Sequence, residues 1–404
     1  MNAANVRSLT HGFFPAEPQT LKGTGLGFAE VEGLILKYLL NCGVAAGRHI
    51  AEQIRLAFGV VSPTLDDLKA QLVVSYRDSA PMNDYYYELT EAGLMRARQR
   101  NERNTFFGSA PIRLSDYCSS VKAQSIEQSK PHLADLKRAF ADLQLPPTVV
   151  SQIGQAVNAG RALFLYGAPG NGKTCIVERV IRAVSEYVWI PRCITVTDEI
   201  IRLYDPATHE EVSFENVDAF DHKTRADQRW VLIKRPTVVA GGELTLEMLE
   251  CGRNPATGIN EAPLQMKSNG GALVIDDFGR QRITTTELLN GWIVPPEKAH
   301  DYLQLPSGRQ IEVPFAQLLV FSTNLDPRQI VDEAFLRRIP YKVEVFDPSE
   351  ADFKALFFRT ADGHGFSYDP SVVDYLLEKH YRQADRPLRF CHARDILLQV
   401  KNCM

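Results

Sequence analysis

The sequence has no long apolar run. Its longest ones, such as those in "LVVSY" and "ALVIDD", have the length of a strand, whereas a helix needs roughly 20 apolar residues to cross a bilayer. The opening stretch, "MNAANVRSLTHGFFPAEPQT", also lacks the charged region and the apolar region of a secretory signal. We therefore expect no transmembrane helix and no secretory targeting.

Paired cysteines are missing as well. The seven cysteines are scattered along the chain, without a C-x-x-C pair and without nearby histidines at the spacing of a zinc site. We therefore expect reduced, mostly buried thiols, which are typical of the cytoplasm, and we expect the protein to be cytoplasmic.

An excess of charge of one sign is also absent. The formal net charge of -4 gives no broad electrostatic reason to bind nucleic acid or an anionic membrane, although a local basic patch stays possible. Apolar residues make up 45% of the chain and charged residues 23%, which is ordinary for a globular protein. The sequence has no internal repeat and no low-complexity tract, and 404 residues allow two or three domains.

One motif gives a strong chemical signal. The apolar strand "ALFLYG" leads into G-x-x-x-x-G-K-T at Gly167–Thr174, and the helical pattern "CIVERVIRAV" follows. Glycines let such a loop turn its N–H groups toward phosphate oxygens, while the lysine reaches the β- and γ-phosphates and the threonine hydroxyl binds magnesium. The predicted nucleotide-binding residues are Gly167, Ala168, Pro169, Gly170, Asn171, Gly172, Lys173, Thr174 and Cys175.

A second stretch, "ALVIDDFG", contains the D-F-G triplet of protein kinases. A kinase also needs a G-x-G-x-x-G loop, a separate strand lysine and an H-R-D loop, and none of these stands around or before Asp277. After a phosphate-binding loop, an apolar strand that ends in two acids predicts a different role. We expect Asp276 to hold the Mg²⁺ shell and Asp277 to orient or deprotonate the attacking water.

The pattern from Arg161 onward predicts the fold class. Short apolar strands alternate with helices, which favours a parallel sheet that is covered on both faces. After Asp347 the chain is predicted to be helical to its end. The expected strands are "ALFLYG", "CITV", "ALVIDD", "QLLVFSTN" and "YKVEVF".

The first quarter of the chain has another pattern. Apolar spacing predicts helices in "FAEVEGLILKYLLNCG", in "GRHIAEQIRLAF" and from Ser62 in "SPTLDDLKAQLVV". Two strands, "LVVSYRD" and "DYYYEL", follow, and Thr90 opens a further helix. This order resembles a winged helix-turn-helix domain, and "YELTEAG" looks like the junction between wing and helix in many bacterial regulators.

From about residue 115 onward the chain resembles the AAA+ ATPases. "GAPGNGKT" is similar to their Walker A motif, "LVIDD" to Walker B and "QLLVFSTN" to the sensor 1 strand. The resemblance implies that the bound nucleotide is ATP and that Asn324 lies beside its γ-phosphate. It makes Arg337 and Arg338 in "DEAFLRRI" the candidate arginine fingers, and it makes Arg394 the candidate for sensor 2, with Arg389 in reserve.

Two further segments resemble the MoxR-like and magnesium-chelatase-like branch. "DYLQLPSGRQIEVPF" is expected to form a hairpin before sensor 1, and residues 241–271 an excursion before Walker B. The resemblance implies a ring-type homo-oligomer, a hexamer, with inserts that touch a client or line a pore. A loop without any client role is the alternative. Asp277 departs from the family pattern, which usually has glutamate at this position.

The winged helix predicts DNA binding by its second helix. That helix carries Asp66 and Asp67, which would repel phosphates, and only Lys69 in favour. The basic residues lie on a later helix instead, at Arg96, Arg98, Arg100 and Arg103. We therefore favour docking to a protein or positioning of the oligomer over DNA binding.

Together these observations predict an α/β P-loop AAA+ core with an α-helical C-terminal lid, preceded by a winged-helix domain. The expected domains are 1–110, a linker and helical segment at 111–158, the core at 159–347 and the lid at 348–404. The leading hypothesis is an ATP- and Mg²⁺-dependent remodeller of a protein client. The alternatives are a DNA-binding, ATP-dependent regulator and a nucleotide-gated scaffold with slow turnover.

Overall fold

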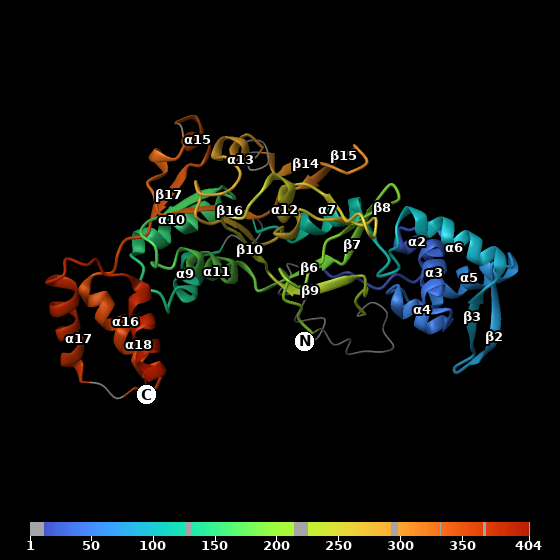
Figure 1. The fold of residues 1–404 in the computed structure, drawn as a ribbon, viewed down its shortest axis with the longest axis horizontal. Coiled ribbons are helices and arrows are strands. Elements are labelled where there is room, and N and C mark those ends of the chain that lie inside the picture. The colour runs from blue at the N-terminus through green and yellow to red at the C-terminus, as the bar shows by residue number, and fades with distance from the viewer. Residues whose placement is uncertain are drawn as a thin grey trace.

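The computed structural model describes residues 12–126, 131–213, 225–291, 298–331, 333–366 and 369–403. The molecule is elongated, with an N-terminal domain at one end, an α/β body in the middle and C-terminal helices at the other end (Figure 1). Within the described ranges, no helix is long and apolar enough to span a bilayer.

The N-terminal domain packs its helices on a three-stranded antiparallel sheet with the order β1-β3-β2. Its core is one cluster of buried side chains that includes Leu34, Leu65 and Tyr87. In chain order, the elements are α2 (Leu21–Thr24), α3 (Phe28–Cys42), β1 (Val44–Ala46), α4 (Gly47–Gln53), α5 (Phe58–Ala70), β2 (Val74–Ala80), β3 (Asp84–Leu89) and α6 (Glu91–Arg103).

The ends of these elements follow local chemistry. The Thr90 side chain accepts a hydrogen bond from the Gly93 N–H at 3.1 Å, so it caps α6 as predicted. The start of α5 was predicted wrongly. The helix begins at Phe58, and Pro63 lies inside it. Because Val60 and Val61 are buried, the apolar face of α5 starts well before Ser62.

The central sheet of the body has five parallel strands in the order β10-β13-β16-β5-β17. Alternate residues of each inner strand enter two separate cores. Leu163 and Leu165 face one cluster, while Phe164 faces the other. The strands are β5 (Leu163–Tyr166), β10 (Thr237–Ala240), β13 (Ala272–Ile275), β16 (Leu318–Thr323) and β17 (Tyr341–Glu344).

Helices cover both faces of this sheet, which confirms the predicted α/β class. Ile153 and Val177 belong to the cluster on one face, whereas Leu288 and Phe278 belong to the cluster on the other. The elements around the sheet are α9 (Leu133–Ala139), α10 (Pro147–Asn158), α11 (Lys173–Val184), η1 (Leu246–Leu249), α13 (Thr285–Gly291), η2 (Pro327–Gln329) and α15 (Glu333–Arg338).

One strand of the central sheet was assigned wrongly from the sequence. The segment "CITV" forms β7 (Cys193–Val196), which pairs with other strands in a second sheet, and "TVVA" of β10 occupies the position expected for it. Both segments are short and apolar, and periodicity alone does not tell which of two such segments joins a given sheet.

The second sheet has the order β11-β12-β8-β7-β4 and lies beside a two-stranded sheet, β6-β9. Helix α7 belongs to this part of the body, because its Tyr117 is buried in the same cluster as Ile194 and Val231. The elements are β4 (Ile112–Arg113), α7 (Leu114–Ala123), β6 (Tyr187–Pro191), β7, β8 (Glu199–Arg202), β9 (Trp230–Lys234), β11 (Gly252–Arg253), β12 (Asn260–Glu261) and α12 (Leu264–Lys267).

The hairpin predicted before "QLLVFSTN" is present. Strands β14 (His300–Gln304) and β15 (Gln310–Pro314) pair antiparallel, and Gly308 in their turn has φ +84°. Leu303 and Ile311 bury one face of the hairpin in the core of the second sheet. Tyr302 lies on the other face and is half exposed.

The C-terminal helices form a small unit with its own core around Phe353, Tyr381 and Leu397. Ser349 begins the unit as the cap of its first helix, with the Asp352 carboxylate returning to the Ser349 N–H. The elements are α16 (Glu350–Gly363), α17 (Pro370–Leu377), the short π-helix η3 (Glu378–Arg382) and α18 (Phe390–Cys403).

A buried arginine of the body contacts the N-terminal domain. Arg229 and Asp227 are both buried and lie 2.7 Å apart. The Arg229 guanidinium also donates to the carbonyl oxygens of Thr24 at 2.9 Å and Pro111 at 3.4 Å. Asp227 compensates the buried charge of Arg229, and the hydrogen bond to Thr24 links the body to the N-terminal domain.

Candidate nucleotide-binding site

The phosphate-binding loop connects β5 to α11. Gly167 has φ +141°, and a Cβ atom built there would lie 2.2 Å from the Val345 carbonyl oxygen. Gly170 has φ +84°, a backbone conformation that side chains with a Cβ rarely adopt. The loop ends at the N-terminus of α11, where unpaired N–H groups and the helix dipole favour an anion. This geometry suits a bound phosphate.

Lys173 lies at the start of α11 and is buried. Its ammonium group donates to the carbonyl oxygens of Gly167 at 2.9 Å and Ala168 at 3.2 Å, and to the Asn324 side-chain oxygen at 2.7 Å. Burial lowers the pKa of Lys173, while the nearby carboxylates of Asp276 and Asp277 act in the opposite direction. The loop therefore holds a positive charge at the site expected for the phosphates.

The two acidic residues directly follow β13, which ends at Ile275. The Asn324 side-chain amide follows β16 and donates to the Asp277 carboxylate at 3.1 Å. Asp277 has φ +49°, a left-handed backbone conformation, and Asp276 accepts a hydrogen bond from the Asp277 N–H at 3.0 Å. Asp277 is exposed.

Three adjacent parallel strands thus bring the predicted residues together. β13, β16 and β5 are neighbours in the sheet, and their carboxyl ends meet at one edge. At that edge Lys173, Asn324 and Asp277 form one hydrogen-bonded row. Ligands of open α/β sheets bind at this edge, so the row lies where a nucleotide would.

The residues present fit magnesium that is bound together with a nucleotide. Among the described residues, no group of three or more histidine, cysteine or acidic side chains is arranged to hold a metal ion. Mg²⁺ bound with a nucleotide needs only one or two protein oxygens, because water and phosphate supply the other ligands. The Thr174 hydroxyl and the Asp276 carboxylate, both partly exposed, suit that role.

A cleft with a volume of about 320 Å³ opens beside the phosphate loop. One wall comes from the loop and α11, and a second from the loop after α9. The C-terminal helices provide the third wall. Its apolar lining includes Leu143, Leu145, Ile176, Leu356 and Phe390. Apolar walls with a few polar groups are typical of small-molecule sites, and this cleft suits the flat face of a base.

Sequence reasoning missed most of this cleft. Leu143 and Leu145 lie in a loop, Leu356 lies on α16, and each is an ordinary apolar residue of its segment. The alternation of leucines in "DLQLPP" was the only local signal. Arg359 was also missed. It lines the cleft and donates to the Asp142 carbonyl oxygen at 2.5 Å.

The two arginines considered for sensor 2 differ in position. Arg394 lines the cleft, and its exposed guanidinium pairs with Asp395 at 3.1 Å. Arg389 is more buried and pairs with Asp347, in the segment between β17 and α16. Arg394 therefore stays the candidate that can approach a nucleotide.

The candidate arginine fingers lie on α15. Arg337 and Arg338 are both exposed, and the Arg338 guanidinium lies over the Phe335 ring at 5.8 Å. They are not among the residues that line the cleft of their own chain. Their role thus stays a prediction that concerns a neighbouring subunit.

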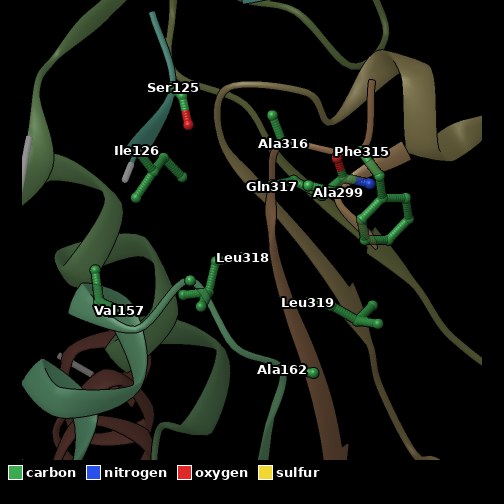
Figure 2. Close-up of a pocket in the computed structure, with 11 residues that line it drawn as sticks. Ser125, Ile126, Val157, Ala162, Ala299, Phe315, Ala316, Gln317, Leu318 and Leu319 are labelled. Carbon is green, nitrogen blue, oxygen red and sulfur yellow. The ribbon is translucent and has the colours of Figure 1, made fainter. Parts of the chain in front are cut away.

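A second, smaller cavity, drawn in Figure 2, lies beside the start of β16, where Leu318 and Leu319 line it. Its volume of about 30 Å³ admits about one water molecule. Val157, Ala162 and Leu318 contribute apolar lining, and the Gln317 amide is buried without a hydrogen-bond partner among the described residues. This cavity is far too small for a nucleotide.

Two thiols in the cleft give a direct test of occupancy. Cys175 and Cys391 both line it, and burial raises the pKa of each thiol. We expect ATP with Mg²⁺ to slow their alkylation about tenfold, because bound nucleotide excludes the reagent. Peptide mapping by mass spectrometry would measure the rates. Cys42 and Cys403 are exposed and serve as internal controls; equal protection of all four thiols would contradict the assignment of the cleft.

The fold and the site define an α/β P-loop protein with a helical C-terminal unit. Residues 349–404 match a family model described as "Domain of unknown function (DUF8689)". This match covers the C-terminal helices alone. No curated protein matches the sequence.

Several solved structures are similar to the chain. The complex between subunits BchI and BchD of magnesium chelatase has 18% identity and a TM-score of 0.36, covering 63% of this chain and 71% of that one. NtrX from Brucella abortus in complex with ADP has 15% identity and a TM-score of 0.37, covering 75% and 58%. A RuvB mutant from Thermotoga maritima has 15% identity and a TM-score of 0.34, covering 63% of each. These values are low, and the fold class rests on the strand order above.

Proposed function

We propose that this protein binds ATP with Mg²⁺ and hydrolyses it as an oligomeric, AAA+-type remodeller of a protein client. One observation carries the proposal. Lys173, Asn324 and Asp277 form a hydrogen-bonded row at the carboxyl ends of neighbouring parallel strands. A cation, an amide and an exposed carboxylate in this order are the groups that phosphoryl transfer to water needs.

Each residue of the row has a chemical task. Lys173 would neutralise charge on the β- and γ-phosphates, and Thr174 and Asp276 would hold Mg²⁺, which would supply further positive charge for the developing phosphate charge. Asp277 accepts a proton from the attacking water, and Asn324 holds both that carboxylate and the lysine in place. The apolar cleft takes the base.

The arrangement of arginines supports assembly. Arg337 and Arg338 are exposed on α15 and do not line the cleft of their own chain. In the proposed ring, one or both reach the γ-phosphate of the next subunit, which makes hydrolysis depend on assembly. The interface is then head-to-tail, as in any closed ring of identical subunits.

A protein client is favoured over DNA by the charges of the N-terminal domain. The carboxylate of buried Glu32 pairs with Arg96 at 2.7 Å and Arg100 at 3.0 Å, so two of the four arginines of α6 serve the core of the domain. Helix α5 exposes Asp66 and Asp67. A surface with this charge pattern neutralises few phosphates.

Assembly dependence is the test of the proposal. Phosphate release per subunit is expected to rise with protein concentration, in step with oligomer size by light scattering. The Arg337→Ala/Arg338→Ala double variant is expected to lose turnover by about 10³-fold, and Lys173→Ala by about 10²–10³-fold. Mixed one to one, they should regain about a quarter of wild-type turnover, because an intact lysine then meets an intact arginine of its neighbour.

Two results would contradict a ring with shared sites. The first is turnover per subunit that stays constant over the concentration range in which light scattering detects assembly. The second is a mixture of the two variants that is no more active than either variant alone.

A further inference from the structure

The phosphate loop contacts the last helix of the chain directly. The first N–H groups of a helix lack partners within the helix. In α18 the Cys391 N–H donates to the Gly170 carbonyl oxygen at 3.0 Å, and the Phe390 N–H donates to the Asn171 side-chain oxygen at 3.4 Å. Residues of the phosphate loop therefore cap a helix more than 200 residues away in the sequence.

The Asn171 side chain is held in this orientation from its other end. Its amide nitrogen donates to the Asp347 carboxylate at 2.7 Å, and the same carboxylate pairs with Arg389. Asn171 is buried, where polar groups need hydrogen-bond partners inside the protein. Asp347 and the Phe390 N–H supply these partners at the two ends of its amide. Asp347 lies between β17 and α16, where the body passes into the C-terminal helices.

The fit between loop and helix is tight. A Cβ atom on Gly170 would lie 2.5 Å from the Cys391 sulfur. The same C-terminal helices also line the cleft, through Leu356, Phe390 and Arg394. A change in the position of α18 on the loop therefore changes the wall of the cleft.

We propose that Asn171 is a positioning residue that caps α18 and thereby seats the C-terminal helices over the nucleotide cleft. This inference rests on the proposed function, because the ligand of the cleft is the nucleotide. The capping side chain comes from the phosphate loop itself, so the shape of the loop and the position of α18 are coupled. Asparagine suits the role, since its short amide accepts from helix N–H groups as an N-cap does.

The first test is Asn171→Ala in the full-length protein. We expect the amide protons of Phe390 and Cys391 to exchange about tenfold faster, measured by hydrogen exchange without nucleotide, while α17 is unchanged. The dissociation constant for ADP is expected to rise about tenfold. The substitution removes the hydrogen bond from Asn171 to the charged Asp347 carboxylate, and loss of such a bond has an effect of this size. The KM for ATP should rise by the same factor, with kcat reduced less than about threefold.

Controls separate positioning from general damage. Asn158→Ala removes an asparagine at the end of α10 that donates to the Pro131 carbonyl oxygen, and it should leave ADP affinity and α18 exchange unchanged. Asp347→Ala releases the same amide and should act like Asn171→Ala. In the double variant, the Asn171 substitution should add less than about twofold, because both residues act through one contact.

The outcomes distinguish this inference from the proposed function. Unchanged exchange at Phe390 and Cys391, or full additivity of the two substitutions, would overturn the role of Asn171. Absence of ATP turnover in the wild type, combined with the expected changes in exchange and ADP affinity, would leave that role intact and refute hydrolysis instead.

Discussion

The Lys173→Ala variant is expected to lose nearly all ATP turnover, by about 10²–10³-fold, because removal of one preorganised charge at a reacting phosphate has effects of that size. The lysine donates to two loop carbonyls and to Asn324. In the variant, the phosphates lose a buried cation and Asn324 loses the group that orients it. Steady-state phosphate release and direct binding of a fluorescent ATP analogue would measure the two effects.

A matched lysine provides the control. Lys234 pairs with Glu210 at 2.5 Å on the surface, and both side chains are about half exposed or more. Lys234→Ala should therefore keep turnover within about twofold of wild type, since exposed pairs contribute little. Retention of more than a tenth of wild-type turnover by Lys173→Ala would contradict the assignment of the phosphate site.

The local parts of this site were predictable from the sequence. The phosphate loop, the acids after β13 and Asn324 after β16 each follow an apolar strand, and a strand with its exit loop is a local pattern. Parallel strands then bring these exits to one edge without further information. The local patterns alone predict Lys173 and Asp277, whereas Asn324 is predicted through the resemblance of its strand to sensor 1.

Contacts between distant segments were not predictable in this way. The segment "CITV" belongs to the second sheet because β7 pairs with β4 and β8. A single sequence does not show which strands pair. The cap that Asn171 gives to α18 joins two segments whose local patterns are complete without it. The cleft was missed for the same reason, since its walls come from three separate parts of the chain.

The backbone at Asp277 explains why aspartate can stand where the resembling ATPases usually have glutamate. With φ +49°, this residue is in the left-handed region, which aspartate and asparagine adopt more readily than residues with longer side chains. Its carboxylate meets Asn324 at 3.1 Å. The short side chain is therefore already within reach of the row that begins at Lys173.

Asp277→Asn should reduce kcat by about 10²–10³-fold, because it removes the proposed base and keeps the shape and the backbone preference. The amide oxygen can still accept from Asn324, so ATP affinity is expected to stay within about threefold of wild type. Single-turnover hydrolysis and ATP binding on the same samples would separate the chemical step from affinity. Slow wild-type turnover that the substitution leaves unchanged would favour a nucleotide-gated scaffold instead.

Asp277→Glu tests whether the short aspartate side chain limits the rate of hydrolysis or suits the geometry of this site. The added methylene moves the carboxylate out of register with Asn324, and the left-handed backbone costs the longer residue about 1 kcal/mol. We expect turnover to fall about tenfold, since small misplacements of a catalytic group have effects of this order. A glutamate variant faster than wild type would mean that aspartate limits hydrolysis, and the native protein would then act as a slow switch.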